Sequence, residues 1–209
     1  MSNRYNVIDI NSWKRKIHCQ IFRNAVQPQY CVSVELDVTN FYKVIKERDM
    51  SYTLSFIYIV TKCANEIEEF RYRFLDDKVV LYESIDTSFT YMDKDNELFK
   101  VVNVPMCGSI EEYLENATEI ISKQKEYFTG PIEKDVYQFS ALPWVVFTHV
   151  SHTESGQKDK AQPLFDWGKF HEKDGNLVMP LSIQVHHSFV DGIHIGKLVN
   201  NIQKYLDEM

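Results

Sequence analysis

The sequence is poor in chain breakers, and it has no stretch that could anchor it in a membrane. Only 7 of its 209 residues are glycine and 6 are proline, too few for a flexible linker, and we expect one domain over residues 1–209. No apolar run reaches the length of a membrane span, and the first residues lack the pattern of a signal peptide. These absences predict a soluble, cytoplasmic protein without a membrane partner.

Positive charge is also scarce. Lysine and arginine number 23 against 30 aspartate and glutamate residues, which gives a net charge of -7, and no basic stripe appears. Because phosphate contacts need clustered Lys and Arg, nucleic acid is excluded as a partner. The four cysteines have scattered spacings without a CxxC pair, and they are Cys19, Cys31, Cys63 and Cys107. We expect reduced, mostly buried thiols rather than disulfides.

The pattern of apolar residues predicts strands and helices in mixed order, and hence an α+β fold. Strand-like content is found in residues 30–39 and 78–92. Apolar residues recur at helical spacing in residues 53–70, 108–127 and 195–206. The second helix opens with a capping box formed by Ser109 and Glu112. A turn at Asp174-Gly175 predicts a hairpin into a strand over residues 177–187. The polar residues 151–163 predict a surface loop.

Two adjacent histidines end this last strand, in the stretch QVHHSFVDGIH over residues 184–194. The alternation of strand side chains predicts that His187 shares the buried face with Val185, whereas His186 points the other way. His187 could be a core histidine bonded to a backbone carbonyl, with Asp191 capping the last helix. It could also act as a general base, because a neutral imidazole can take a proton from a hydroxyl.

A metal site is a further alternative for the histidine pair. The two imidazoles could join His149, His152 or His171, and the segment THVSH has the spacing His-x-x-His. No cysteine cluster and no HExxH motif accompanies them. We therefore expect no metal.

QVHHSFVDGIH resembles the HHxxxDG signature of the chloramphenicol acetyltransferase family, which the catalytic domains of dihydrolipoyl acyltransferases share. Further segments resemble the family's motifs in the family's order from residue 12 to the end, and they are SWKRK, YCVSVELDVT, EEFRYR, FSALPW and PLFDWGKF. The resemblance implies a single-domain, two-layer sandwich with a mixed sheet and helices on one side. It also implies a homotrimer with active sites between the subunits.

The resemblance assigns roles to individual residues. His187 corresponds to the general base that deprotonates the acceptor hydroxyl, and Ser140 to the serine that stabilises the oxyanion. Asp191 and Arg15 correspond to a structural ion pair that supports the site. Acetyl-CoA is then the co-substrate, and a small molecule with a hydroxyl group is the acceptor.

The same resemblance implies two binding residues, and the sequence also departs from the family pattern at several positions. Tyr30 aligns with an aromatic residue of the acceptor pocket, and Lys169 is a candidate partner for the coenzyme phosphates. Asp166 and Trp167 replace a Thr-Met pair whose threonine holds a water near the tetrahedral intermediate. A carboxylate there would oppose developing negative charge or favour a cationic acceptor. Two histidines, His149 and His152, occupy the region that lines the antibiotic pocket.

Three hypotheses about function remain open at this point. The first is an O-acetyltransferase that acts on chloramphenicol and confers antibiotic resistance. The second keeps the reaction and changes the acceptor to another hydroxylated metabolite or drug, because of Asp166, Trp167 and the two histidines. The third is a trimeric protein that binds a ligand without acetylating it, against which the presence of His187 and Ser140 counts.

Overall fold

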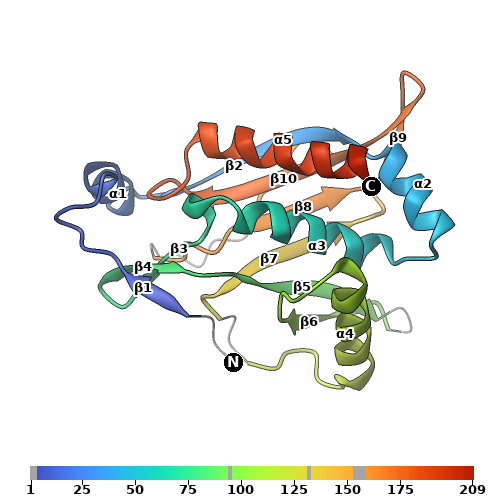
Figure 1. The fold of residues 1–209 in the computed structure, drawn as a ribbon, viewed down its shortest axis with the longest axis horizontal. Helices are drawn as coiled ribbons and strands as arrows, with labels where there is room; N and C mark the ends of the chain where they lie inside the picture. Colours follow the sequence, from blue (N-terminus) through green and yellow to red (C-terminus); the bar gives the residue numbers. More distant parts are fainter. Residues whose placement is uncertain (1–3, 94–95, 131–132, 153–158) are drawn as a thin grey trace.

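A mixed β-sheet with helices on one face forms the body of the protein (Figure 1). The computed structural model describes residues 4–93, 96–130, 133–152 and 159–209. The strand order across the sheet is β2 (Gln29–Asp37), β10 (Asn176–His186), β8 (Leu164–Gly168), β7 (Val136–Leu142), β5 (Asp86–Asp93) and β6 (Leu98–Val104). β7 runs parallel to β5 and β8, whereas the other neighbours are antiparallel. The predicted α+β class and mixed sheet are confirmed.

Strand alternation separates an apolar face of the sheet from a polar one. On β10 the side chains of Leu181, Ile183 and Val185 are at most 1% exposed and pack in the hydrophobic core. The residues between them point to the other side, which we call the polar face. There the register aligns four side chains across neighbouring strands, and they are Ser33, Ser182, Asp166 and Ser140.

Three helices lie over the apolar face, α5 (Gly192–Glu208), α3 (Tyr52–Asn65) and α4 (Ile110–Lys123), with α3 between the other two (Figure 1). α3 is apolar almost all round, which is typical of a helix buried on every side. α4 begins with the predicted capping box, in which Ser109 Oγ accepts from the Glu112 amide and Glu112 Oε2 from the Ser109 amide. The shorter helices are α1 (Lys16–Arg23), α2 (Thr39–Glu47) and the 3-10 turn η1 (Glu68–Phe70).

The strand-like segment 78–92 divides between two sheets. Its first part is β4 (Lys78–Tyr82), which joins β1 (Tyr5–Val7) and β3 (Tyr72–Leu75) in a small antiparallel sheet, and its second part is β5. Ile85 lies between the two parts, and its backbone N–H and C=O both bond to the Asn65 side chain. Because this side chain satisfies the backbone where the ladder is interrupted, the chain can leave one sheet and enter the other.

The remaining predictions from the sequence have mixed outcomes. The hairpin is confirmed, since β9 (His171–Lys173) pairs with the start of β10 across Asp174-Gly175. Part of the predicted loop 151–163, residues 153–158, lies outside the described residues. All four cysteines are free, but only Cys19 and Cys63 are buried, so the expectation of mostly buried thiols is half right. In the described part of the chain, no helix is long and apolar enough to cross a membrane.

Candidate functional site

His187 follows the last residue of β10, in the turn that leads to α5. Its backbone N–H donates to Pro28 O (2.9 Å), which continues the pairing between β10 and β2 by one residue. The imidazole lies face to face on the Phe22 ring, with centroids 3.8 Å apart and planes 8° from parallel. The Tyr30 ring contacts it from a tilted position at 4.6 Å. Two aromatic rings from the N-terminal segment therefore hold the orientation of His187.

The two histidines of the pair differ in burial, in the opposite sense to the prediction. The His187 side chain is 34% exposed, whereas His186 is 2% exposed and packs against Phe74 and Phe189. The prediction that His187 lies on the buried face is wrong because β10 ends at His186, and strand alternation does not extend into the turn. His186 Nδ1 accepts a hydrogen bond from the Ser188 amide (3.1 Å). This contact gives His186 a structural role, as predicted.

Asp191 forms a two-pronged ion pair with Arg15. Arg15 donates from Nη1 to Oδ2 (2.7 Å) and from Nη2 to Oδ1 (3.1 Å), and its Nε donates to Ser188 O (3.4 Å). The Arg15 side chain is only 9% exposed and that of Asp191 31%. The hydrogen bonds from Arg15 hold the pKa of Asp191 below its ordinary value, against the effect of burial. The predicted pairing of these two residues is present.

Asp191 also lies next to the imidazole of His187. Asp191 Oδ1 is 3.2 Å from His187 Nδ1, but the two groups are not aligned for a hydrogen bond, and Nδ1 has no other partner among the described residues. Nδ1 is buried, so solvent reaches the ring from its Nε2 side. The ring nitrogen that is open to a substrate is therefore Nε2.

Tyr30 has a more specific position than the sequence indicated. Its hydroxyl donates to Val190 O (3.2 Å), so it anchors the turn after His187 while its ring contacts the imidazole. Burial raises the pKa of Tyr30 to about 12, with a further contribution from the charge of Asp191. The phenol is therefore neutral at physiological pH.

Phe22 was not predicted from the sequence, and neither was the helix α1 that carries it. The exposed residues Ile17 and Ile21 give α1 a weak and misleading apolar pattern, because they face solvent at 67% and 62% exposure. Only the placement of an aromatic residue at the end of a short helical segment could have suggested a role.

Ser140 lies on the polar face, far from His187 of the same chain. Ser140 is paired with Asp166 on β8, and Asp166 is paired with Ser182 on β10. His187 follows Ser182 by five residues along the chain. With about 3.3 Å per residue along a strand and 4.8 Å between strands, the two residues lie roughly 19 Å apart. No thioester carbon can contact both side chains of one chain.

Asp166 is buried on the polar face at 1% exposure. Its Oδ1 lies 2.8 Å from His152 Nε2, while Oδ2 has no hydrogen-bond partner in the described part of the chain. Burial raises the pKa of Asp166, and the contact with His152 partly offsets this rise. Two of the four residues that depart from the family pattern, Asp166 and His152, are therefore partners, which the sequence did not reveal. Another of the four, Trp167, is 3% exposed and packs on Phe56 in the core.

The other candidate residues lie apart from these groups. Lys169 follows β8 and is exposed, and its backbone N–H donates to Val145 O (2.8 Å). His149 is exposed, and His171 Nε2 lies 3.8 Å from Glu35. Among the described residues, no three side chains of the metal-binding types form a group that could hold a metal ion.

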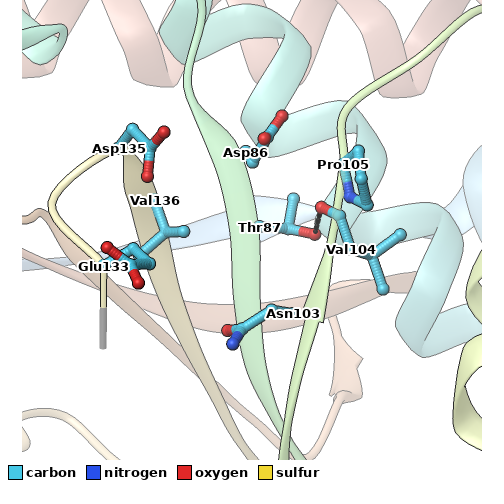
Figure 2. A pocket seen from close by; sticks show the side chains of 8 residues that line it. All are labelled: Asp86, Thr87, Asn103, Val104, Pro105, Glu133, Asp135 and Val136. Carbon is cyan, nitrogen blue, oxygen red and sulfur yellow. Dashed lines mark hydrogen bonds between the residues drawn. The ribbon is translucent and has the colours of Figure 1, made fainter. Parts of the chain in front are cut away.

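An acidic pocket of about 340 Å³ opens at the ends of β5, β6 and β7 (Figure 2). Figure 2 shows the carboxylates of Asp86, Glu133 and Asp135 around it, with Asn103 at its lower side. None of the residues assigned from the sequence lines this pocket. The pocket is therefore separate from the turn between β10 and α5 that carries His187.

Comparisons with known proteins agree over nearly the whole chain. A family model described as "Chloramphenicol acetyltransferase" matches residues 3–203. A chloramphenicol acetyltransferase of Proteus mirabilis is 31% identical over 205 residues, 97% of this chain and 94% of that protein, and one of Haemophilus influenzae is 27% identical with 97% of each chain covered. A solved chloramphenicol acetyltransferase has a TM-score of 0.88 at 29% identity, covering 97% of this chain and 100% of the other. A probable dihydrolipoamide acetyltransferase from Listeria monocytogenes, at 16% identity and a TM-score of 0.65, shares the fold.

Proposed function

The chain belongs to the chloramphenicol acetyltransferase family and is an acyltransferase, and on that premise we propose that it transfers an acetyl group from acetyl-CoA to a hydroxyl of chloramphenicol. His187 takes the proton of the hydroxyl through Nε2, and the oxygen attacks the thioester carbonyl to form a tetrahedral intermediate. The C–S bond then breaks, and coenzyme A leaves as a thiol with the proton that His187 returns. The observation that carries the proposal is the geometry of His187, whose Nε2 side is open while the rest of the ring is held by Phe22 and Tyr30. A positioned base suffices for a thioester, which is already activated.

The direct test is release of the coenzyme A thiol from acetyl-CoA in the presence of chloramphenicol. We expect turnover with the native protein and a loss of roughly 10²–10⁴-fold in the variant His187→Ala. The matched control is His171→Ala, which removes a histidine from β9 and should keep full turnover. Equal turnover in the native protein and His187→Ala would contradict the mechanism.

Ser140 is proposed as the donor to the oxyanion, and the site is proposed to form between subunits of a homotrimer. The spacing of roughly 19 Å between Ser140 and His187 within a chain supports this, because one substrate could then meet both groups only if they came from different copies. Loss of a single oxyanion donor is worth about 3 kcal/mol, or a hundredfold in rate. We expect that loss in Ser140→Ala.

A mixing experiment tests the shared site. Trimers assembled from equal amounts of His187→Ala and Ser140→Ala chains should contain intact sites at about a quarter of the interfaces, each with His187 from one chain and Ser140 from its neighbour. We therefore expect activity near a quarter of the native level. Activity no higher than the sum of the two separate variants would contradict a site between subunits.

Acetyl-CoA is proposed to bind with its phosphates near Lys169, since this lysine is exposed directly after β8. The substitution Lys169→Ala should raise the KM for acetyl-CoA and leave kcat and the KM for the acceptor unchanged. An unchanged KM for acetyl-CoA would remove Lys169 from the coenzyme site.

A second candidate function keeps the reaction and changes the acceptor to another alcohol, in particular a cationic one. The observation that favours it is the buried carboxylate of Asp166, which His152 satisfies at only one oxygen. Turnover with amino alcohols but not with chloramphenicol, reduced in Asp166→Asn, would select it. Turnover with chloramphenicol that Asp166→Asn leaves unchanged would reject it.

A further inference from the structure

His194 is the last residue of the stretch QVHHSFVDGIH, and it has no part in the mechanism proposed above. It is the third residue of α5, and its side chain is 9% exposed. Its Nδ1 accepts a hydrogen bond from the backbone N–H of Asp191 (2.9 Å). In the usual capping box a glutamate or glutamine at this position accepts that N–H, so a histidine here is unusual.

The other ring nitrogen of His194 contacts a residue from a distant segment. His194 Nε2 lies 3.4 Å from Oε1 of Glu69, which belongs to η1 and whose side chain is 14% exposed. Since Nδ1 accepts a hydrogen bond, the proton of the neutral imidazole must be on Nε2, where the Glu69 carboxylate faces it. The two contacts together select one tautomer of the ring.

Asp191 is the residue that this arrangement fixes. Its backbone N–H is held by His194, while its carboxylate reaches Arg15 at 2.7 and 3.1 Å and lies 3.2 Å from His187 Nδ1. A rotation of the Asp191 backbone would therefore move its carboxylate away from both partners. A chain of contacts therefore runs from Glu69 through His194 to Asp191, and from Asp191 to Arg15 and His187.

We propose that His194, held by Glu69, is a positioning residue that orients Asp191, and through it the Arg15 ion pair and the catalytic imidazole of His187. The proposal rests on the acetyl-transfer function above, and it adds to it a role for His194 and for Glu69, the second glutamate of the EEFRYR segment. His194 accepts the backbone N–H of Asp191, so in this proposal it acts through Asp191 and not on a substrate.

Protonation of His194 should switch this support off. With a proton on Nδ1, the ring could no longer accept the hydrogen bond from the Asp191 N–H, and the two N–H groups would repel each other. Four charged groups act on the ring, Glu69 from η1, Arg15 from the segment before α1, Asp191 at the cap and Lys197 on α5 itself. Burial lowers the pKa of His194, and the negative charge of Glu69 opposes this. The ring is therefore neutral at physiological pH.

The test compares His194→Leu with His194→Gln, and His171→Leu is the control. A glutamine can accept the Asp191 N–H as in an ordinary capping box, whereas leucine cannot. We expect His194→Leu to lose kcat at least tenfold with both KM values within twofold of native, and His194→Gln to recover most of that loss. His171→Leu should keep native kcat. Equal kcat in the leucine and glutamine variants would overturn the proposal.

The pH profile separates positioning from simple packing. In the native protein the acid limb of kcat should contain a component due to protonation of His194, and that component should be absent in His194→Gln. Glu69→Gln removes the charge that raises the pKa of His194, so the part of the acid limb due to His194 should move to lower pH. Identical acid limbs in native protein, His194→Gln and Glu69→Gln would contradict the proposal.

A measurement without turnover keeps this inference distinct from the acetyl-transfer proposal. Nitrogen NMR of protein labelled at histidine reports the tautomer of each imidazole, and we expect a single Nε2–H form for His194. The His187 signals should shift in His194→Leu and return in His194→Gln. An Nδ1–H form of His194 would overturn the inference even in an active enzyme, whereas absent turnover with the expected tautomer would reject only the acetyl-transfer proposal.

Discussion

The substitution Asp191→Asn tests whether the Arg15–Asp191 pair stabilises the fold as well as the site. Asparagine keeps the shape of the side chain but removes the charge, and it presents an NH₂ group to one of the two guanidinium nitrogens. Arg15, whose side chain is 9% exposed, would then retain one good acceptor and the longer contact to Ser188 O. A buried cation without its counter-charge is costly.

The magnitude follows from the two contacts that change. Hydrogen bonds to charged groups contribute about 1.5–3 kcal/mol each, and one of the two is lost outright. The 31% exposure of Asp191 allows water to compensate in part, so the value lies below that for a fully buried pair. We expect the free energy of unfolding to fall by about 2–3 kcal/mol, which for a chain of this length lowers the Tm by roughly 5–10 °C.

Urea unfolding as a function of pH provides the assay. The pKa of Asp191 is lowered in the folded state, so its contribution is fully present above the unfolded pKa, about 3.9, and is lost as the pH falls through the folded value. The difference in unfolding free energy between native protein and Asp191→Asn should therefore be constant from pH 7 to about pH 5. Below that range it should shrink.

Two results would refute this reasoning. The first is an unchanged unfolding midpoint in Asp191→Asn, and the second is a difference from native protein that does not depend on pH below 4. The control is Glu119→Gln, which removes the acidic partner of Lys123 on the exposed surface of α4. Its midpoint should not move, because solvent screens exposed pairs.

Three further substitutions have expected outcomes. Phe22→Leu removes the ring stacked on His187, a contact worth about 0.5–1.5 kcal/mol, so kcat measured at saturating substrates should fall roughly two- to tenfold with little change in Tm. Ser109→Ala deletes the N-cap of α4 and should lower the unfolding free energy in urea by about 1 kcal/mol without changing kcat. Ile183→Ala leaves a cavity at a position with 0% exposure, and the same urea measurement should show a loss of about 2–5 kcal/mol. Losses under 0.5 kcal/mol in both stability variants would contradict the packing described.

The extent to which the sequence predicted the fold depended on how local the governing contacts were. Helix α4 was predicted with its capping box because Ser109 and Glu112 are three residues apart and their bonds close within one turn. The hairpin at Asp174-Gly175 was predicted for the same reason. The division of residues 78–92 between two sheets depends on Asn65, twenty residues before Ile85, and no local pattern indicated it.

The same distinction applies to the site. The resemblance to a family supplied His187, Ser140, Asp191 and Arg15, and the ion pair between the last two is present in the structure. Strand alternation gave the wrong burial for His187, because a period of two has meaning only while the strand continues. The pairing of Asp166 with His152 was not predicted, since thirteen residues separate them in the sequence and only the folded polar face brings them together.

The residues of the histidine signature therefore depend on contacts with a distant part of the chain. Within residues 186–191, the Ser188 hydroxyl donates to Cys19 O, and the His187 amide to Pro28 O. Arg15 binds Asp191, and Phe22 and Tyr30 hold the imidazole. Every one of these partners comes from residues 15–30, more than 150 positions earlier in the chain. The base can adopt its orientation only after the N-terminal segment has packed on the turn after β10, so substitutions of these partners should lower kcat although they lie far from the signature in the sequence.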